Sequence, residues 1–267
     1  MQDTLSIMFP LAKKLRSGLL VLIGKGPRAA WLLLADRAGR ISRTMPGGLI
    51  RLDGCVFRSD AGSRKWLLNG EYEGPERFAA KRYIRRDIPV VEFGGSLGVV
   101  SCVVNRRLKN PRHHVVLEAN PQILPTLLEN RNRNRCSFEI LHGAAGGVGK
   151  SVRIYIGDSA LTSSANATAA ESVEVPAFTL ADILQARGFG RCALLCDIEG
   201  SEIEIVRTEM DTLRSRVEVF IVEFHPSING SETVEEARLR LRDHGFKEVW
   251  HQQDVFAYLN SGLISPA

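Results

Sequence analysis

The sequence is poor in cysteine and lacks any long apolar run. None of its five cysteines forms a CxxC pair, and Cys102, Cys192 and Cys196 lie among aliphatic residues, as buried thiols do. This pattern argues against a disulfide scaffold or a zinc site and favours a reducing compartment. No apolar segment reaches the roughly 18 to 20 residues that span a bilayer, and the first basic residues follow an apolar patch, unlike those of a signal peptide. The sequence therefore predicts a cytoplasmic protein, with peripheral contact at the inner face of the membrane as an alternative.

The composition also lacks the bias of disordered or fibrous chains, since 44% of the residues are hydrophobic and 24% are charged. The net charge of +5 is unevenly spread. Residues 1–60 carry ten Lys/Arg and four acidic residues, whereas the rest of the chain carries 25 Lys/Arg and 26 acidic residues. Residues 4–38 place Leu, Ile and Trp on one side and Lys/Arg on the other, which predicts one or two amphipathic helices.

These observations divide the chain into a basic N-terminal extension, 1–65, and a larger domain, 66–267. The extension could lie on an anionic membrane surface through residues 1–40. It could instead cover a site on the larger domain or form a homodimer interface, and the sequence leaves these alternatives open.

Apolar runs and helical patterns alternate from residue 89 onward. A hairpin at Asp53-Gly54 within an extended segment, 40–58, precedes them. Strands are expected at 89–93, 114–117, 137–141, 152–156, 193–196 and 217–224, with a closing antiparallel hairpin of 247–251 and 255–259. Helices are expected at 75–86, 97–108, 121–131, 180–187, 201–207 and 232–243. Thr179 and Gly188 bound the fourth of these helices, and the small, polar residues 159–171 predict a mobile loop. The alternation predicts an α/β fold with a mostly parallel sheet covered on both faces.

A glycine-rich turn follows the first of these strands, in the segment Val91 to Gly98 (VEFGGSLG). Glycines let the backbone approach a ligand, and the start of the following helix offers free N–H groups. The spacing is Glu-x-Gly-x-x-x-Gly, which differs from the G-x-G-x-x-G dinucleotide fingerprint. Glu92 would repel a pyrophosphate and attract an ammonium group. A tight strand–helix turn without a ligand is the alternative.

A second acidic residue, Glu118, ends the next strand about 20 residues later. An acidic residue at this position usually holds a ribose diol. The two features together indicate an adenosine ligand with a positively charged tail, which is S-adenosylmethionine.

Four ionisable residues follow two later strands: Asp197, Glu199, Glu223 and His225. The carboxyl ends of parallel strands meet at one edge of a sheet, so these side chains are expected to converge beside the ligand. Carboxylates in such a place are costly unless they are solvated, paired or used. Glu202 is better explained as an acidic residue in the first turn of a helix, where it interacts favourably with the helix dipole. The same set could hold a metal, but an Asp-x-Glu pair with a distant His is weak evidence, and no metal ligand is assigned.

The order of these motifs resembles the FkbM-type S-adenosylmethionine-dependent methyltransferases from about residue 66 onward. The resemblance includes Tyr72-Glu73, the 92–98 turn, the Glu118-Ala119-Asn120-Pro121 segment, Asn130 with Asn134, and above all the Asp-x-Glu-Gly-x-Glu segment 197–202. It implies a Rossmann-like seven-stranded methyltransferase sheet and O-methylation of a hydroxyl on a sugar, glycan or secondary metabolite. The cofactor residues that it and the turn indicate are Glu73, Glu92, Gly94, Gly95, Ser96, Gly98, Glu118, Ala119, Asn120, Ala144 and Asp197.

The predicted chemistry is in-line methyl transfer, with Asp197 or Glu199 as general base and Glu223 and His225 opposite. One alternative is an NAD(P)-binding oxidoreductase, opposed by the missing third glycine and by the closing hairpin. A non-catalytic cofactor-binding scaffold is a second, opposed by the four polar strand-end residues. The third is an RNA methyltransferase, opposed because the basic residues cluster in 1–60. We therefore expect no nucleic-acid partner.

Overall fold

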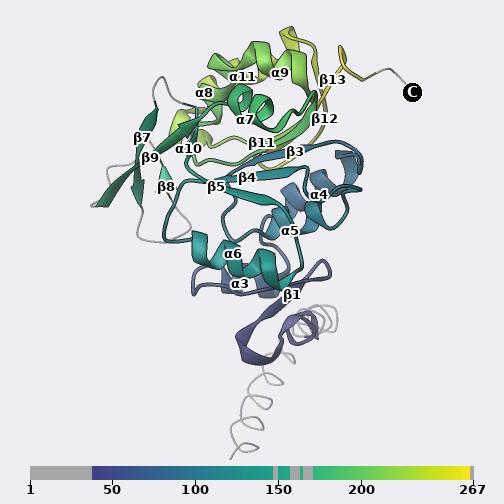
Figure 1. The fold of residues 1–267 in the computed structure, drawn as a ribbon, viewed down its shortest axis with the longest axis vertical. Helices are drawn as coiled ribbons and strands as arrows, with labels where there is room; N and C mark the ends of the chain where they lie inside the picture. Colours follow the sequence, from purple (N-terminus) through teal and green to yellow (C-terminus); the bar gives the residue numbers. More distant parts are fainter. Residues whose placement is uncertain (1–37, 147–149, 157–162, 165–170, 265–267) are drawn as a thin grey trace, which may run out of the picture.

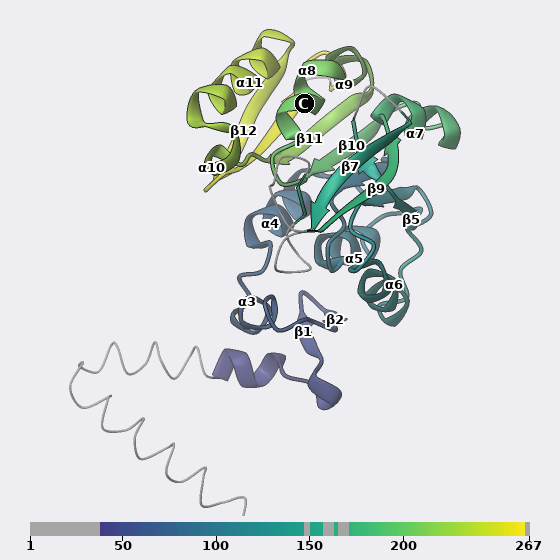
Figure 2. The ribbon, with the colours of Figure 1, turned by 90° about the vertical axis from the view of Figure 1, so that its left-hand side faces the viewer.

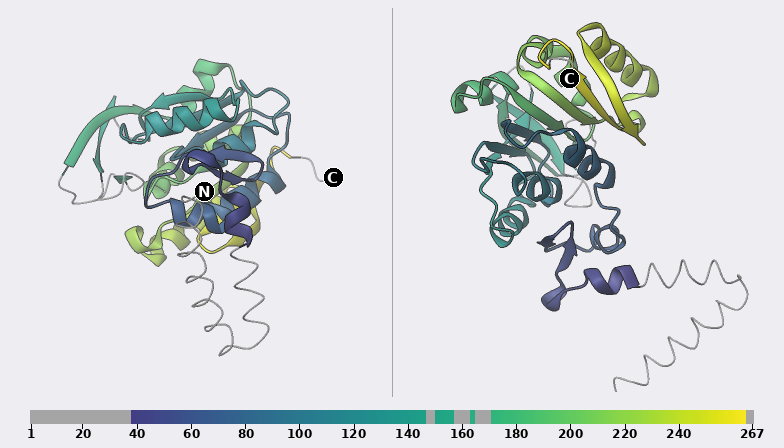
Figure 3. Two further views of the ribbon diagram at one scale, coloured as in Figure 1. Left: turned by 90° about the horizontal axis from the view of Figure 1, so that it is seen from below. Right: turned by 90° about the vertical axis from the view of Figure 1, so that its right-hand side faces the viewer.

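A seven-stranded sheet forms the centre of the computed structural model, which describes residues 38–146, 150–156, 163–164 and 171–264. Five parallel strands occupy the interior and one edge, and an antiparallel hairpin closes the other edge (Figures 1 and 3). In spatial order the strands are β12 (Phe246–Gln252), β13 (Val255–Asn260), β11 (Val217–Glu223), β10 (Cys192–Cys196), β3 (Val90–Phe93), β4 (His114–Glu118) and β5 (Glu139–His142). The predicted α/β class, with a mostly parallel sheet and a closing hairpin, is confirmed.

Helices cover both faces of this sheet (Figures 1 and 2). One face carries α4 (Gly74–Tyr83), α5 (Val99–Asn105) and α6 (Leu124–Arg133), and the other carries α7 (Leu180–Arg187), α8 (Glu202–Thr208), α9 (Met210–Arg216) and α11 (Ser231–Asp243). The central strands β3, β10 and β11 are mostly apolar, because successive side chains point to opposite faces and both faces are covered. In β10, Leu194 packs in the core under α7, α8 and α9, whereas Ala193 and Leu195 pack in the core with α4 and α5.

Local signals at helix α7 agree with the sequence prediction. The Thr179 side chain accepts a hydrogen bond from the Asp182 backbone N–H, and the Asp182 carboxylate accepts one from the Thr179 backbone N–H, which completes a capping box. Gly188 ends the helix with φ of 64°, in the left-handed conformation that favours glycine.

The predicted hairpin at Asp53-Gly54 is present as β1 (Ile50–Leu52) and β2 (Cys55–Phe57). Its apolar side chains share a core with α5, α6 and α3 (Arg64–Asn69). The expected extended segment 40–58 is wrong at its start, because residues 38–43 are helical. The predicted helices over 4–38 lie outside the described residues, apart from residue 38.

Asn130 fastens this hairpin to the rest of the molecule. Its fully buried amide accepts from the Arg58 N–H at 2.7 Å and donates to the carbonyls of Arg58 and Leu97. Asn134 makes the equivalent pair of bonds with the N–H and carbonyl of Val56.

We expect Asn130→Ala to lower the free energy of unfolding by about 2–4 kcal/mol, because three backbone groups lose their partner in or near the core. Urea denaturation followed by circular dichroism measures the change. Asn132→Ala, at an exposed position of the same helix, should cost less than about 0.5 kcal/mol. Equal losses in the two variants would contradict this role for Asn130.

A second sheet stands beside the first, at the left of Figure 1. Its order is β6 (Ala144–Ala145), β9 (Glu171–Phe178), β7 (Ser151–Ile156) and β8 (Ser163–Ser164). Only β7 was expected from the sequence. Most of the predicted loop 159–171 lies outside the described residues, and the described positions 163–164 and 171 belong to strands. Within the described part of the chain, no helix is both long and apolar enough to cross a bilayer.

Candidate active site

A cavity of about 740 Å³ opens at the carboxyl ends of β3, β4, β5 and β10. Its volume falls in the range of small-molecule sites. The chain proceeds outward from β3 to β4 and β5 on one side and later to β10 and β11 on the other, so β3 and β10 flank the point where the strand order reverses. Ligands of open α/β sheets bind in the crevice at such a point.

The glycines of the 94–98 turn are required by packing within the protein. A Cβ atom on Gly94, whose φ is 89°, would lie 1.8 Å from the carbonyl oxygen of Asp197, so the loops after β3 and β10 touch backbone to backbone. A Cβ on Gly98 would lie 2.6 Å from Leu127, and one on Gly95 would lie 2.6 Å from Val116. Gly94 lines the cavity, whereas Gly95 and Gly98 do not.

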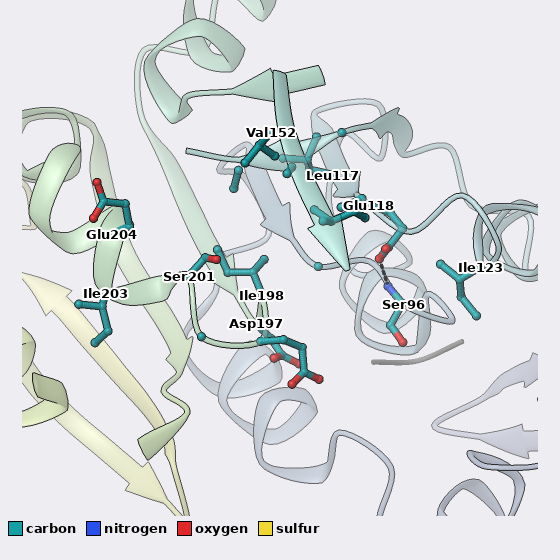
Figure 4. A pocket seen from close by; sticks show the side chains of 18 of the residues that line it. Ser96, Leu117, Glu118, Ile123, Val152, Asp197, Ile198, Ser201, Ile203 and Glu204 are labelled. Carbon is teal, nitrogen blue, oxygen red and sulfur yellow. Dashed lines mark hydrogen bonds between the residues drawn. The ribbon is translucent and has the colours of Figure 1, made fainter. Parts of the chain in front are cut away.

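Glu118 is held rigidly in the cavity wall. Its carboxylate accepts hydrogen bonds from the backbone N–H groups of Ser96 and Asn120, each at 2.7 Å, and Figure 4 shows the bond to Ser96. The Ser96 hydroxyl lies 2.9 Å from that of Tyr72. Burial raises the pKa of Glu118, and the backbone N–H groups oppose this shift. Ala119 lines the cavity beside Glu118, but Asn120 is buried behind it.

The structure does not bring Glu92 to the cavity. Its buried carboxylate accepts from the Ser101 hydroxyl at 2.7 Å and lies 3.1 Å from His114 Nε2. The neighbouring Val91 and Phe93 pack on one face of the sheet, so strand alternation directs Glu92 to the opposite face, under α5. The direct contact with an ammonium group that the sequence suggested has no counterpart in this geometry.

The four predicted strand-end residues do lie together. Asp197 and Glu199 line the cavity. His225 Nε2 stands behind them, 3.6 Å from Asp197 Oδ1 and 3.5 Å from Glu199 Oε2. One carboxylate oxygen each of Glu223 and Asp197 and one ring nitrogen of His225 all lie within 4.8 Å of one another. Glu223 and His225 do not themselves line the cavity.

Glu202 does more than place a charge in the first turn of α8. Its side chain is fully buried, and it accepts from the backbone N–H groups of Ile198 and Gly200. The same carboxylate lies 3.0 Å from His225 Nδ1. The contact with Glu202 fixes the His225 ring at Nδ1 and directs Nε2 toward Asp197 and Glu199. Glu202 is therefore a positioning residue.

Two further acidic residues come from the start of α4. Glu73 lines the cavity beside Tyr72. Burial raises its pKa well above the usual value, and Glu76, Asp197 and Glu92 add to the shift. Glu76 is 7% exposed, and its Oε2 has no hydrogen-bond partner among the described residues. Sequence reasoning missed Glu76, since it reads as an ordinary polar position of a helix.

Burial, together with repulsion between neighbouring carboxylates, raises the pKa values of the acidic residues in this group. Burial raises the pKa of Asp197 to about 8, against the opposing effect of His225. Burial, Asp197 and Glu76 raise the pKa of Glu223 to about 10. Burial alone would lower the pKa of His225, but Glu202, Asp197 and Glu199 raise it to about 9. The cavity wall is therefore arranged to receive positive charge.

Backbone strain is concentrated at the same place. Six described residues other than glycine have positive φ, and three of them, Glu73 (45°), Ser96 (45°) and Glu199 (52°), line the cavity. Such conformations cost on the order of 1–3 kcal/mol each and persist where the surroundings impose them, commonly at functional sites.

The remaining wall comes from segments that sequence reasoning did not connect with the site. Trp66 of α3 and Val152 and Ile154 of β7 contribute apolar surface, and Gly143 and the predicted Ala144 follow β5. On the side away from Ser96 and Glu118, the polar Ser201 and Glu204 lie beside the apolar Ile198 and Ile203 (Figure 4). Further polar residues of the wall are Arg207, Asn229 and Thr233. No local sequence signal marks the residues of β7 or α3 as part of a site.

Comparisons with known proteins bear on this geometry. Residues 91–248, more than half of the chain, match the family described as the methyltransferase FkbM domain. No curated protein matches the chain. Similar solved structures include a precorrin-6Y C5,15-methyltransferase from Geobacter metallireducens, with 13% identity, a TM-score of 0.43 and coverage of 72% of this chain and 89% of that chain. The fibrillarin of Aeropyrum pernix with bound S-adenosylmethionine is 10% identical, with a TM-score of 0.41 and coverage of 69% of this chain and 73% of that chain. The ribosomal protein L11 methylase of Lactobacillus delbrueckii is 8% identical, with a TM-score of 0.40 and coverage of 71% of this chain and 77% of that chain.

Proposed function

The chain belongs to the FkbM methyltransferase family, and from this premise we propose that it transfers the methyl group of S-adenosylmethionine to a hydroxyl of a sugar, glycan or secondary metabolite. The observation that carries the proposal is the cavity at the reversal of strand order, which is lined by Glu118 and by the carboxylates of Glu73, Asp197 and Glu199.

The residues present fit this cofactor. Glu118 occupies the position where an acidic side chain receives ribose hydroxyls. Glu73 and Asp197 line the same cavity, and their raised pKa values reflect a site short of positive charge. A ligand with ammonium and sulfonium groups relieves that repulsion, whereas the pyrophosphate of a dinucleotide increases it.

S-adenosylmethionine, when bound, supplies an electrophilic methyl group. The chain's own part is to hold the acceptor oxygen in line and to take its proton. Of the four strand-end residues, Asp197 and Glu199 line the cavity, so these two are able to touch an acceptor hydroxyl. Glu223 and His225 stand behind them and keep them in position, with His225 itself held by Glu202.

The proposed acceptor class follows from the polar residues in the cavity wall. Ser201, Asn229 and Thr233 offer neutral hydrogen-bonding groups, and Glu204 and Arg207 offer charged ones. A hydroxyl-rich acceptor satisfies such a surface better than an apolar one, because buried polar groups without partners are costly.

Ligand-induced stabilisation tests the cofactor assignment. We expect S-adenosylhomocysteine at about 100 times its Kd to stabilise the full chain by about 2.7 kcal/mol, which corresponds to a rise in Tm of roughly 5–10 °C for a protein of this size. NADH and NADPH at equal concentration should leave Tm unchanged. Stabilisation by a dinucleotide alone would support an oxidoreductase. Binding of S-adenosylhomocysteine without methyl transfer to any of a panel of hydroxyl acceptors would support a non-catalytic scaffold.

A further inference from the structure

Three side chains from two neighbouring strand ends direct ligand atoms to one point beside the cavity. Asp197 follows β10, Glu223 ends β11, and His225 lies two residues further on. One ligand atom from each lies within 4.8 Å of the other two. Asp197 lines the cavity, so this point is reached from the space where the acceptor is proposed to bind.

The orientation of His225 is the one expected of a metal ligand. The Glu202 carboxylate lies 3.0 Å from Nδ1, and its own position is fixed by the backbone N–H groups of Ile198 and Gly200. In metal sites a carboxylate commonly orients a ligating histidine in this way and leaves the other ring nitrogen free for the ion. Here the other nitrogen, Nε2, lies 3.6 Å from Asp197 Oδ1 and 3.5 Å from Glu199 Oε2.

An independent observation, the burial of Glu76, points to a cation at the same place. Glu76 is 7% exposed and enters from α4, a different element from the three ligands. Its carboxyl group contacts that of Glu223, and its Oε2 has no hydrogen-bond partner among the described residues. Within the described part of the chain, no Lys or Arg forms an ion pair with Asp197, Glu223 or Glu76. A buried carboxylate of this kind needs a positive partner.

We propose that Asp197, Glu223 and His225 bind one divalent cation at the acceptor end of the cavity, with Glu76 behind them as a further source of negative charge. Carboxylate ligands suit Mg²⁺ and Mn²⁺, and a single imidazole shifts the preference toward Mn²⁺. The site differs from structural zinc sites, which are closed by four Cys or His ligands.

The role of this cation rests on the proposed function. An acceptor hydroxyl bound to the ion becomes more acidic and more fixed in position. Glu199 lines the cavity next to His225 and is not part of the ligand set, so it is the carboxylate that takes the hydroxyl proton.

Mn²⁺ binding to the full chain tests the site without reference to catalysis. After treatment with a chelator and its removal, we expect one Mn²⁺ per chain, detected as loss of the free-ion signal in electron paramagnetic resonance. Asp197→Asn and His225→Gln should abolish binding or weaken it by at least tenfold. Glu202→Gln should weaken it by about 10–100-fold, the usual effect of losing a carboxylate that orients a ligating histidine. Asp211→Asn removes the same charge from an exposed position of α9 and should bind as the wild type does.

Cooperative thermal unfolding of each variant shows that it is folded. The inference is overturned if the wild type binds no Mn²⁺, or if the Asp197, His225 and Glu202 variants bind it as tightly as the Asp211 variant. Titration with S-adenosylhomocysteine in the presence of chelator separates this result from the proposed function. If that ligand binds and Mn²⁺ does not, only the cation site is wrong. If Mn²⁺ binds and that ligand does not, the cation site stands and the cofactor assignment fails.

Discussion

Asp197→Asn is expected to lower kcat/KM for methyl transfer by about 10³-fold, within the range of general-base and charge-positioning effects. The amide keeps the shape of the side chain but removes its charge beside Glu199 and His225. The Gly94 backbone packs against the Asp197 carbonyl, which the substitution leaves in place, so the fold should be unchanged. Release of S-adenosylhomocysteine in the presence of a panel of sugar and secondary-metabolite acceptors measures the loss.

Two comparisons make this result specific. Asp211→Asn, at an exposed position outside the cavity, should retain wild-type kcat/KM. The Kd of Asp197→Asn for S-adenosylhomocysteine should change by less than about tenfold, since Glu118 and Ser96 remain. Full turnover in both Asp197→Asn and His225→Ala, with normal cofactor binding, would show that the catalytic residues lie elsewhere.

Glu118→Gln is expected to weaken binding of S-adenosylhomocysteine by about 10–100-fold. Hydrogen bonds to a charged group contribute about 1.5–3 kcal/mol each, and about 1.4 kcal/mol corresponds to a factor of ten in Kd. The amide NH₂ of glutamine cannot accept from Ser96 or Asn120, so one of these backbone N–H groups loses its partner and the side chain turns away from the cavity.

Isothermal titration calorimetry measures the change in Kd. Glu139→Gln provides the control, because Glu139 pairs with Arg187 at the surface and does not line the cavity. It should bind S-adenosylhomocysteine as the wild type does. Wild-type affinity in Glu118→Gln would mean that Glu118 only stabilises the loop that contains Ser96.

Where burial alone decides the structure, the sequence was sufficient. Strand β10 and residues 219–222 of β11 are apolar at consecutive positions because both sheet faces are covered, and such runs are recognisable without tertiary information. The capped helix α7 and the Asp53-Gly54 hairpin depend on local hydrogen bonds and backbone conformation, so they were also predictable.

Features that depend on tertiary contacts were not predictable. Strand β9 contains Pro176, which lacks the N–H of a typical ladder, and its pairing with β7 stabilises it. The short helix α9 follows α8 almost without a break, so no loop signal separates them. Glu76 lies next to Glu223 only because α4 packs beside the end of β11, which is a tertiary contact.

The candidate site was likewise predictable only in part. Its position at the strand ends followed from topology, and the proximity of Asp197, Glu199, Glu223 and His225 agrees with that reasoning. The direction of Glu92 was open to prediction from strand alternation, because Val91 and Phe93 fix the parity of β3. The motif at 92–98 instead suggested a ligand contact, although its glycines are explained by contacts with Asp197, Val116 and Leu127.

A crystal structure with S-adenosylhomocysteine tests the central claim most directly. We expect the ligand in the cavity at the ends of β3, β4 and β10, with a ribose hydroxyl within hydrogen-bonding distance of the Glu118 carboxylate and the sulfur on the side of Asp197 and Glu199. A ligand bound outside this cavity, or one whose ribose contacts neither Glu118 nor Ser96 while its sulfur points away from Asp197, would contradict it.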